Sequence, residues 1–214
     1  MTLSTALRSH ETKQRQWRPQ DLIAFEDDIA EIFAQGKIPY PVHLAGGNET
    51  QIIEAFADIR SEDYVLAGWR SHYHALLHGV PPEDLKAEIL KGHSVSLCFP
   101  RHKVLCSGIV GGVAPIAVGI AWALKQKNDH DPVGNSSMVH VFLGDMSAES
   151  GIVHEAMKYA TGHNLPIRWI IEDNGVSVCT DTRAVWGEGH SVFDLYYSYK
   201  LTRAHVGVNK WVRF

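Results

Sequence analysis

The sequence lacks an excess of positive charge, because 20 lysines and arginines stand against 24 aspartates and glutamates for a formal net charge of −4. A basic surface for nucleic acid is therefore not expected. No apolar run approaches the roughly 20 residues that a membrane-spanning helix needs, so no membrane partner is expected either. The sequence also has no internal repeat, and no G-x-G-x-x-G follows an early strand, which disfavours a nucleotide-binding oxidoreductase.

Targeting signals and cysteine patterns are also missing. The N-terminal stretch MTLSTALRSHETKQRQWRPQ has no apolar core of a signal peptide, and the 3 cysteines are odd in number and follow no pattern. We therefore expect reduced thiols and a cytoplasmic location. With 45% apolar residues, the sequence predicts one domain over residues 1–214, with an N-terminal helical extension over about residues 1–40.

The most informative stretch lies between residues 138 and 178. An apolar run at 139–143 predicts a buried strand, which ends at Gly144-Asp145. Apolar residues at steps of three and four predict a helix over 150–163, and a second apolar run at 167–171 predicts a strand that ends at Glu172-Asp173-Asn174-Gly175. A strand, a helix and a strand in this order make a right-handed parallel crossover, so both polar ends emerge at the same edge of one sheet.

That edge of an open parallel sheet is where ligands bind. The Asp145 carboxylate and the Asn174 amide oxygen are hard donors of the kind Mg²⁺ prefers beside a substrate phosphate. The unpaired N–H groups of the following helix, for which Ser147 is the predicted N-cap, favour an anion. Taken one at a time, Asp145 could equally be a helix cap and Asn174-Gly175 a plain turn.

The pair of motifs, GD at 144–145 and DNG at 173–175, resembles the thiamine diphosphate motif. In detail it is most similar to the alpha subunit of the decarboxylating first component of 2-oxo acid dehydrogenase complexes. The resemblance implies Mg²⁺ ligands at Asp145, at Asn174 and at the backbone carbonyl of Val176, with Gly144, Met146 and Ser147 against the cofactor. Met146 replaces the usual second glycine, and a positive φ would be costly for it.

Two upstream segments, GNET at 47–50 and Trp69-Arg70-Ser71-His72, resemble the family's GQEA-like and YR-x-H segments in the same order. The resemblance implies that Trp69 and Arg70 bind the cofactor, Arg70 at its terminal phosphate, and that His72 has a catalytic role. Without the resemblance, Arg70 would be a surface residue paired with Glu62 or Asp63. Together with His74 and His78, His72 either lines the pocket or a partner interface or, as an alternative, belongs to a zinc site.

Gly108-Ile109-Val110-Gly111 precedes a predicted helix with Ile116, Gly119, Ile120 and Ala123 on one face. This stretch resembles the family sequence GIVGAQVPLGAGIA, which implies that the backbone at Gly108 and Val110 contacts the aminopyrimidine of the cofactor. The preceding residues 92–106 show no period and are predicted to form an active-site loop, with Ser96 where the family often has a histidine.

The remaining elements are predicted from periodicity and breaker residues. Helices are expected over 20–35, 49–59 and 82–90 and strands over 63–67 and 194–202, with a polar loop over 179–190. His205 lies in a segment that resembles a family loop whose histidine approaches the diphosphate, and the resemblance implies a catalytic role for it.

We therefore predict an α/β fold, a mostly parallel sheet with helices on both faces, that forms the pyrophosphate-binding domain of a thiamine diphosphate enzyme. The resemblance implies a small 2-oxo acid substrate and a beta-type subunit whose pyrimidine-binding domain supplies the activating glutamate. A homo- or hetero-oligomer is expected, with interface candidates Trp69, Tyr73, Ile109, Val110 and 211–214. A transketolase-like half-enzyme and a nonenzymatic cofactor-binding or assembly subunit remain as alternatives.

Overall fold

A computed structural model describes residues 17–128, 137–187 and 193–206 of the chain. Within these residues the main sheet has six strands in the order β2-β3-β1-β4-β5-β8. All neighbouring strands run parallel except β2, which pairs with β3 in the antiparallel direction at one edge. The strands span Tyr64–Ala67 (β1), Cys98–Phe99 (β2), Val104–Cys106 (β3), Val139–Gly144 (β4), Ile167–Asp173 (β5) and Leu195–Ser198 (β8).

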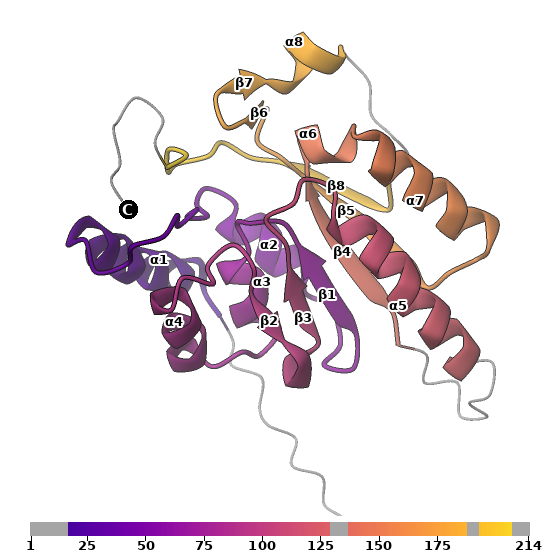
Figure 1. The fold of residues 1–214 in the computed structure, drawn as a ribbon, viewed down its shortest axis with the longest axis horizontal. Coiled ribbons are helices and arrows are strands. Elements are labelled where there is room, and N and C mark those ends of the chain that lie inside the picture. The colour runs from indigo at the N-terminus through magenta and orange to yellow at the C-terminus, as the bar shows by residue number, and fades with distance from the viewer. Residues whose placement is uncertain (1–16, 129–136, 188–192, 207–214) are drawn as a thin grey trace, which may run out of the picture.

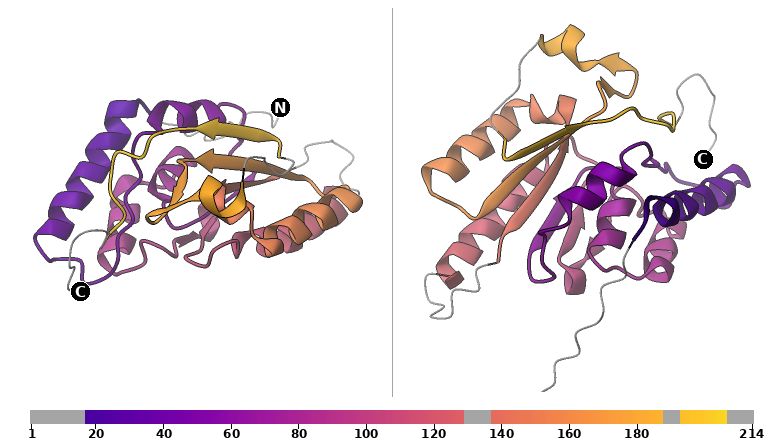
Figure 2. Two further views of the ribbon diagram at one scale, coloured as in Figure 1. Left: turned by 90° about the horizontal axis from the view of Figure 1, so that it is seen from above. Right: turned by 180° about the vertical axis from the view of Figure 1, so that it is seen from behind.

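Helices cover both faces of this sheet (Figure 1). One face carries α1 (Pro19–Ala34), α2 (Glu49–Ala55), α3 (His72–Leu77) and α4 (Pro82–Leu90), and the other carries α5 (Val113–Asn128) and α7 (Gly151–Gly162). The carboxyl ends of β4 and β5 lead into α6 (Asp145–Ala148) and into a small hairpin of β6 (Val176–Ser177) and β7 (Thr180–Asp181), followed by α8 (Thr182–Trp186). Figure 2 shows this hairpin and α8 standing above the strand ends.

Two buried apolar clusters hold these layers together, one on each side of the sheet. The cluster beneath α1 to α4 includes Leu22, Ile29 and Phe142, each with 0% of its surface exposed. The cluster beneath α5 and α7 is built from small and branched residues such as Ala117, Ala121 and Val153, which let the helices lie close to the strands. Residue 142 of β4 faces one cluster and residue 143 the other, as the alternation of a strand between two helical layers requires.

The predicted fold class, α/β with a mostly parallel sheet and helices on both faces, is confirmed. The central β4–α7–β5 crossover lies where the apolar runs placed it, and α4 has the predicted bounds. Helix α1 begins at Pro19, whose missing N–H is not needed at that position, and the chain leaves it through Gly36 at φ +70°.

The shortest elements were not predicted. Residues 92–106 contain β2, a 3-10 helix (Pro100–His102) and β3, so the prediction of a single loop was wrong there. The predicted polar loop at 179–190 likewise contains β7 and α8, while its last residues lie outside the described part of the chain. Strands of two or three residues are too short to show a period. Helix α3 shows none either, because all its residues, His72 to Leu77, are buried.

The ends of the chain are described only in part. Helix α1 packs onto the cluster that contains Phe142, whereas the first 16 residues of the predicted N-terminal extension lie outside the described residues, as does the interface candidate 211–214. Among the described residues, no helix combines the length and the apolar character needed to cross a membrane.

Candidate functional site

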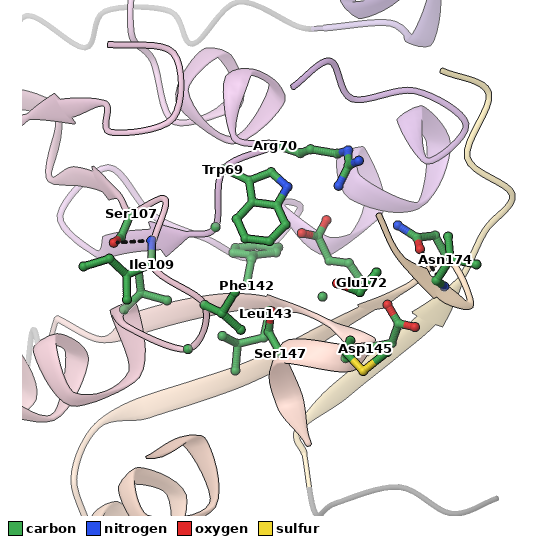
Figure 3. A pocket seen from close by; sticks show the side chains of 18 of the residues that line it. Trp69, Arg70, Ser107, Ile109, Phe142, Leu143, Asp145, Ser147, Glu172 and Asn174 are labelled. Atoms are coloured by element: carbon green, nitrogen blue, oxygen red, sulfur yellow. Dashed lines mark hydrogen bonds between the residues drawn. The ribbon is translucent and has the colours of Figure 1, made fainter. Parts of the chain in front are cut away.

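A pocket lies at the carboxyl ends of β1, β4 and β5, at the predicted edge of the sheet (Figure 3). Five segments line it, namely 68–70 after β1, residues between 107 and 113 after β3, the end of β4 with α6, the end of β5 with the following turn, and Tyr199 after β8. Figure 3 shows that Arg70, Glu172, Asn174 and Asp145 gather at one end of the pocket, whereas Ser107 and Ile109 lie at the other. The pocket thus has a polar end and a more apolar end.

Asp145 stands at the polar end as the first residue of α6, directly after β4. Only 6% of its surface is exposed, and its carboxylate accepts a hydrogen bond from the Thr182 hydroxyl. Burial raises the pKa of Asp145 above its ordinary value, although the hydrogen bond from Thr182 opposes this shift. A buried carboxylate whose negative charge is only partly compensated is suited to a cation.

Asn174 follows β5 in a turn, and hydrogen bonds of its side chain with Val176 and Tyr199 stabilise this turn. Its Oδ1 accepts from the Val176 amide at 3.0 Å, and its Nδ2 donates to the Tyr199 hydroxyl at 3.2 Å. These two bonds fix which end of the amide is oxygen. Gly175 adopts φ +78°, a conformation that glycine takes without strain, so the turn brings Val176 back to the wall of the pocket.

Met146 and Ser147 line the same wall, but their local structure differs from the prediction. Ser147 is not the N-cap of α7, because Ser150 occupies that position and Ser147 lies inside the short helix α6. The chain bends there as one brief turn of helix, with the Ser150 hydroxyl donating to the Ser147 carbonyl at 2.7 Å. Met146 is helical and has no positive φ, so the methionine in place of the usual glycine causes no backbone strain.

Arg70 reaches the polar end from the segment after β1. Its Nη2 lies 3.2 Å from Nδ1 of His205, and its buried Nε has no hydrogen-bond partner among the described residues. Burial lowers the pKa of Arg70, while Tyr199, Glu172 and Asp145 act in the opposite direction. The alternative, a surface pairing of Arg70 with Glu62 or Asp63, is absent from the described contacts, and Arg60 binds both of those carboxylates. A half-buried guanidinium whose buried Nε–H is unused is a donor ready for an anion.

His205 and His43 stack beside Arg70, with ring centroids 4.4 Å apart. Burial lowers the pKa of His43 to about 4, with His205 and Arg70 as further positive neighbours, and burial followed by Arg70 also lowers the pKa of His205. His205 does not line the pocket itself but contacts a residue that does. His43 was missed in the sequence, although it lies four residues before the segment GNET, which the resemblance had already singled out.

His72 is placed elsewhere. It is fully buried, with Nδ1 3.0 Å from Oε1 of Glu26 and Nε2 2.9 Å from the Ser94 hydroxyl, and it does not line the pocket. His74 and His78 are also buried, next to Phe56. The expectation that these three histidines line the cofactor pocket or an interface is therefore wrong, because α3 lies inside the core. The position of His72 does not support a direct catalytic role.

The apolar end is formed by the loop after β3. Ile109 and Val110 are 74% and 48% exposed, and the Ile109 amide donates to the Ser107 hydroxyl at 3.1 Å. Gly111 has φ +69°, and a Cβ there would lie 2.8 Å from the side chains of Ser150 and Ile152, so glycine is required for the loop to touch α7. Gly108 lies between the lining residues Ser107 and Ile109 but does not itself line the pocket.

Other expectations about this surface also change. The segment 92–106 contributes no residue to this pocket, whereas the residues that follow it, from Ser107 on, do line it. Tyr73 is fully buried and cannot lie at an interface as placed, whereas Trp69 is half-buried in the pocket wall.

Glu172 and Tyr199 line the pocket but were not predicted. Glu172 accepts hydrogen bonds from the Tyr197 hydroxyl and from Asn48, and a signal for it was its position directly before Asp173-Asn174.

These donors fit a metal-bound diphosphate. The polar end offers the Asp145 carboxylate and the Asn174 amide oxygen, with Val176 in the same wall, and oxygen donors are what Mg²⁺ takes. The unpartnered Nε of Arg70 beside them suits a phosphate oxygen. Within the described residues, no group of three or more histidine, cysteine or acidic side chains stands close enough to hold a metal by itself.

Comparison with known proteins shows which family the sequence belongs to. The family described as "Dehydrogenase E1 component" matches residues 18–194. The chain is 32% identical to the pyruvate dehydrogenase E1 component subunit alpha of Zymomonas mobilis over 167 residues, which covers 73% of this chain and 46% of that protein. It is 34% identical to the same subunit of Rickettsia prowazekii, with coverages of 73% and 49%.

A third relative is the alpha subunit of the acetoin:2,6-dichlorophenolindophenol oxidoreductase of Bacillus subtilis, at 29% identity over 77% of this chain and 51% of that protein. The chain thus spans about half the length of the curated relatives it matches. The family match covers most of the sequence, including both strand-end motifs and the segments after β1 and β3. The chain therefore belongs to the dehydrogenase E1 component family, in which the relatives that it resembles are alpha subunits.

Proposed function

We propose that the chain is an alpha-type subunit of a thiamine diphosphate-dependent 2-oxo acid dehydrogenase that binds the cofactor diphosphate through Mg²⁺. The observation that carries the proposal is the convergence of Asp145 and Asn174 from adjacent parallel strands onto one pocket that also contains Arg70. Relatives named as pyruvate dehydrogenase alpha subunits support it.

In this proposal the residues divide along the pocket. Asp145, Asn174 and the carbonyl of Val176 hold Mg²⁺, and Arg70 with the α6 backbone at Gly144 to Ser147 receives the diphosphate oxygens. His205, which stacks on His43, contacts the Arg70 guanidinium and would hold it at this end of the pocket. The backbone at Val110 and the Trp69 side chain, which line the pocket, would surround the aromatic part of the cofactor, with Gly108 between the lining residues Ser107 and Ile109.

Thiamine diphosphate, once bound, would supply the carbanion chemistry needed to decarboxylate a small 2-oxo acid. The carboxylates among the described lining residues are Asp145 and Glu172, and Glu172 already accepts bonds from Tyr197 and Asn48. The proposal therefore takes the glutamate that activates the pyrimidine from a beta-type subunit, with the active site at the interface. Ile109 and Val110, exposed at the rim of the pocket, are the contacts expected there.

Calorimetric titration with thiamine diphosphate tests the proposal. We expect binding in the presence of Mg²⁺ and at least about tenfold weaker binding after chelation, which corresponds to about 1.4 kcal/mol. Asp145→Ala should abolish the Mg²⁺-dependent binding while the chain stays folded, because the carboxylate is the charged ligand. Equal affinity with and without the metal would contradict the proposal. With the partner subunit added, decarboxylation read through an artificial electron acceptor should appear.

A further inference from the structure

The first residue of α8, Thr182, contacts both halves of the strand-end motif. Its backbone amide donates to the Gly175 carbonyl at 3.0 Å, next to Asn174, and its hydroxyl donates to Oδ2 of Asp145. Its side chain is 7% exposed, so the hydroxyl has to find its partner within the protein. One residue of α8 therefore links the end of β5 to the end of β4.

The backbone of α8 around Thr182 is itself held in place. Arg183 pairs with the buried carboxylate of Asp173, whose Oδ1 also accepts from the Gly175 amide at 2.8 Å. Asp181 is the N-cap of α8, because its Oδ1 accepts a hydrogen bond from the Ala184 amide at 2.8 Å. Because these contacts fix α8 to the end of β5, the Thr182 hydroxyl lies at a fixed place relative to Asn174.

The Asp145 carboxylate could otherwise rotate about two side-chain torsions. Mg²⁺ demands near-ideal octahedral geometry, so a ligand that rotates freely binds it less tightly. In Figure 3 the carboxylate of Asp145 points toward Asn174. The hydroxyl of Thr182 holds one carboxylate oxygen from outside the pocket, since Thr182 is not among the residues that line it.

We propose that Thr182 is a positioning residue, which orients the Asp145 carboxylate toward Asn174 and sets the geometry of the metal site between the two strand ends. The inference rests on the proposed function, because it requires Mg²⁺ and thiamine diphosphate to bind at Asp145 and Asn174. Thr182, the first residue after β7, does not line the pocket. The inference nevertheless makes it part of the metal site.

The test compares Thr182→Val, which keeps the shape but removes the hydroxyl, with Thr182→Ser, which keeps the hydroxyl. Each full chain is titrated with Mg²⁺ at a fixed concentration of thiamine diphosphate, and binding is followed by calorimetry. We expect Thr182→Val to need at least about tenfold more Mg²⁺ for half-maximal binding and Thr182→Ser to stay within about threefold of the unmodified chain. Thr180→Val, an exposed threonine on the same segment, is the matched control and should leave the Mg²⁺ requirement unchanged.

Thermal unfolding of each variant without ligands separates positioning from stability, since a purely structural hydroxyl would change the unfolding temperature but not the Mg²⁺ requirement. If Thr182→Val does not fold, Thr182→Ala takes its place. A hydroxyl-free variant with the Mg²⁺ requirement of the unmodified chain would overturn this inference alone, as would a Thr182→Ser variant that loses as much as Thr182→Val. Absence of Mg²⁺-dependent binding by the unmodified chain would overturn the proposed function and this inference together.

Discussion

The pocket and the polar cluster beneath α1 contain the same kinds of residues in opposite situations. In the cluster, Glu26, His72 and Ser94 come from three separate segments and form a chain of hydrogen bonds with 0% of each residue exposed. In the pocket, Asp145 and Arg70 also come from separate segments, but they border an open space and Arg70 retains an unpartnered Nε. Because Oε2 of Glu26 in the cluster also has no hydrogen-bond partner among the described residues, access to the open space, rather than residue type or unused hydrogen-bonding capacity, distinguishes the pocket from the structural network.

Two buried aspartates, Asp63 and Asp145, differ in how far the protein compensates their negative charge. Asp63 accepts bonds from Arg60, the Met138 amide and His140, and these hold its pKa well below the ordinary range although burial acts in the opposite direction. Asp145, with Thr182 as its side-chain donor, has a raised pKa because burial dominates. The negative charge of Asp63 is compensated by the fold itself, whereas that of Asp145 is left for a ligand.

Removing a member of the polar cluster should have the largest effect on stability. His72→Ala leaves the Glu26 carboxylate and the Ser94 hydroxyl buried without their shared partner, so we expect a loss of about 3 kcal/mol in the free energy of unfolding. Denaturant unfolding measures it. The control His93→Ala, in an exposed pair with Glu88, should stay within about 0.5 kcal/mol. Conversely, a folded His72→Ala variant that no longer bound thiamine diphosphate would show that the cluster belongs to the site.

Removing the pocket guanidinium should weaken binding rather than the fold. We expect Arg70→Gln to bind thiamine diphosphate about tenfold less tightly, or about 1.4 kcal/mol, because it loses the charge beside Asp145 and Asn174. Binding of thiamine monophosphate should fall by less, since the terminal phosphate is absent. Calorimetry distinguishes the two ligands, and Arg101→Gln, an exposed arginine in the 3-10 helix, is the control. An equal loss for both ligands would mean that Arg70 does not contact that phosphate.

The pH dependence of stability should separate the two aspartates. Because the pKa of Asp145 is raised in the fold, the unfolded chain loses its proton first as the pH rises, and this group lowers the stability of the metal-free chain above the ordinary aspartate range. Asp145→Asn should therefore gain stability relative to the unmodified chain between about pH 4 and 7. Asp63→Asn should show the reverse, with a loss at neutral pH that disappears in acid. Denaturant unfolding from about pH 2 to 7 measures both, because the contribution of Asp63 is lost only below the ordinary aspartate range. The contrast would fail if the stability differences of the two variants changed with pH in the same direction.

The smallest change in stability is expected at the rim of the pocket. Ile109 is 74% exposed, so Ile109→Ser should alter the free energy of unfolding of the metal-free chain by less than about 0.5 kcal/mol. Association with a second copy or with the beta-type subunit should weaken, which light scattering measures at micromolar concentration. Val185→Ser, on the exposed side of α8, is the matched control. Unchanged association of Ile109→Ser would place the interface elsewhere.

The sequence alone predicted the central crossover because its apolar runs and its three- and four-residue steps are long enough to show a period. The strand ends at Asp145 and Asn174 followed from the crossover, since parallel strands joined by one helix present their carboxyl ends at one edge. The residues assigned by resemblance at Trp69, Arg70 and Val110 indeed line one pocket with them.

The tertiary structure decided the rest. His72 lies next to Trp69-Arg70-Ser71 in the sequence, yet α3 directs it into the core, because a helix that follows the strand end carries its residues away from the sheet edge. His43 and His205 meet although their segments are far apart, and Thr182 meets Asp145 across the hairpin that follows β5. The periodicity and spacing of residues in the sequence report local geometry. These long-range contacts depend instead on the path of loops that have no periodicity and that return to the sheet.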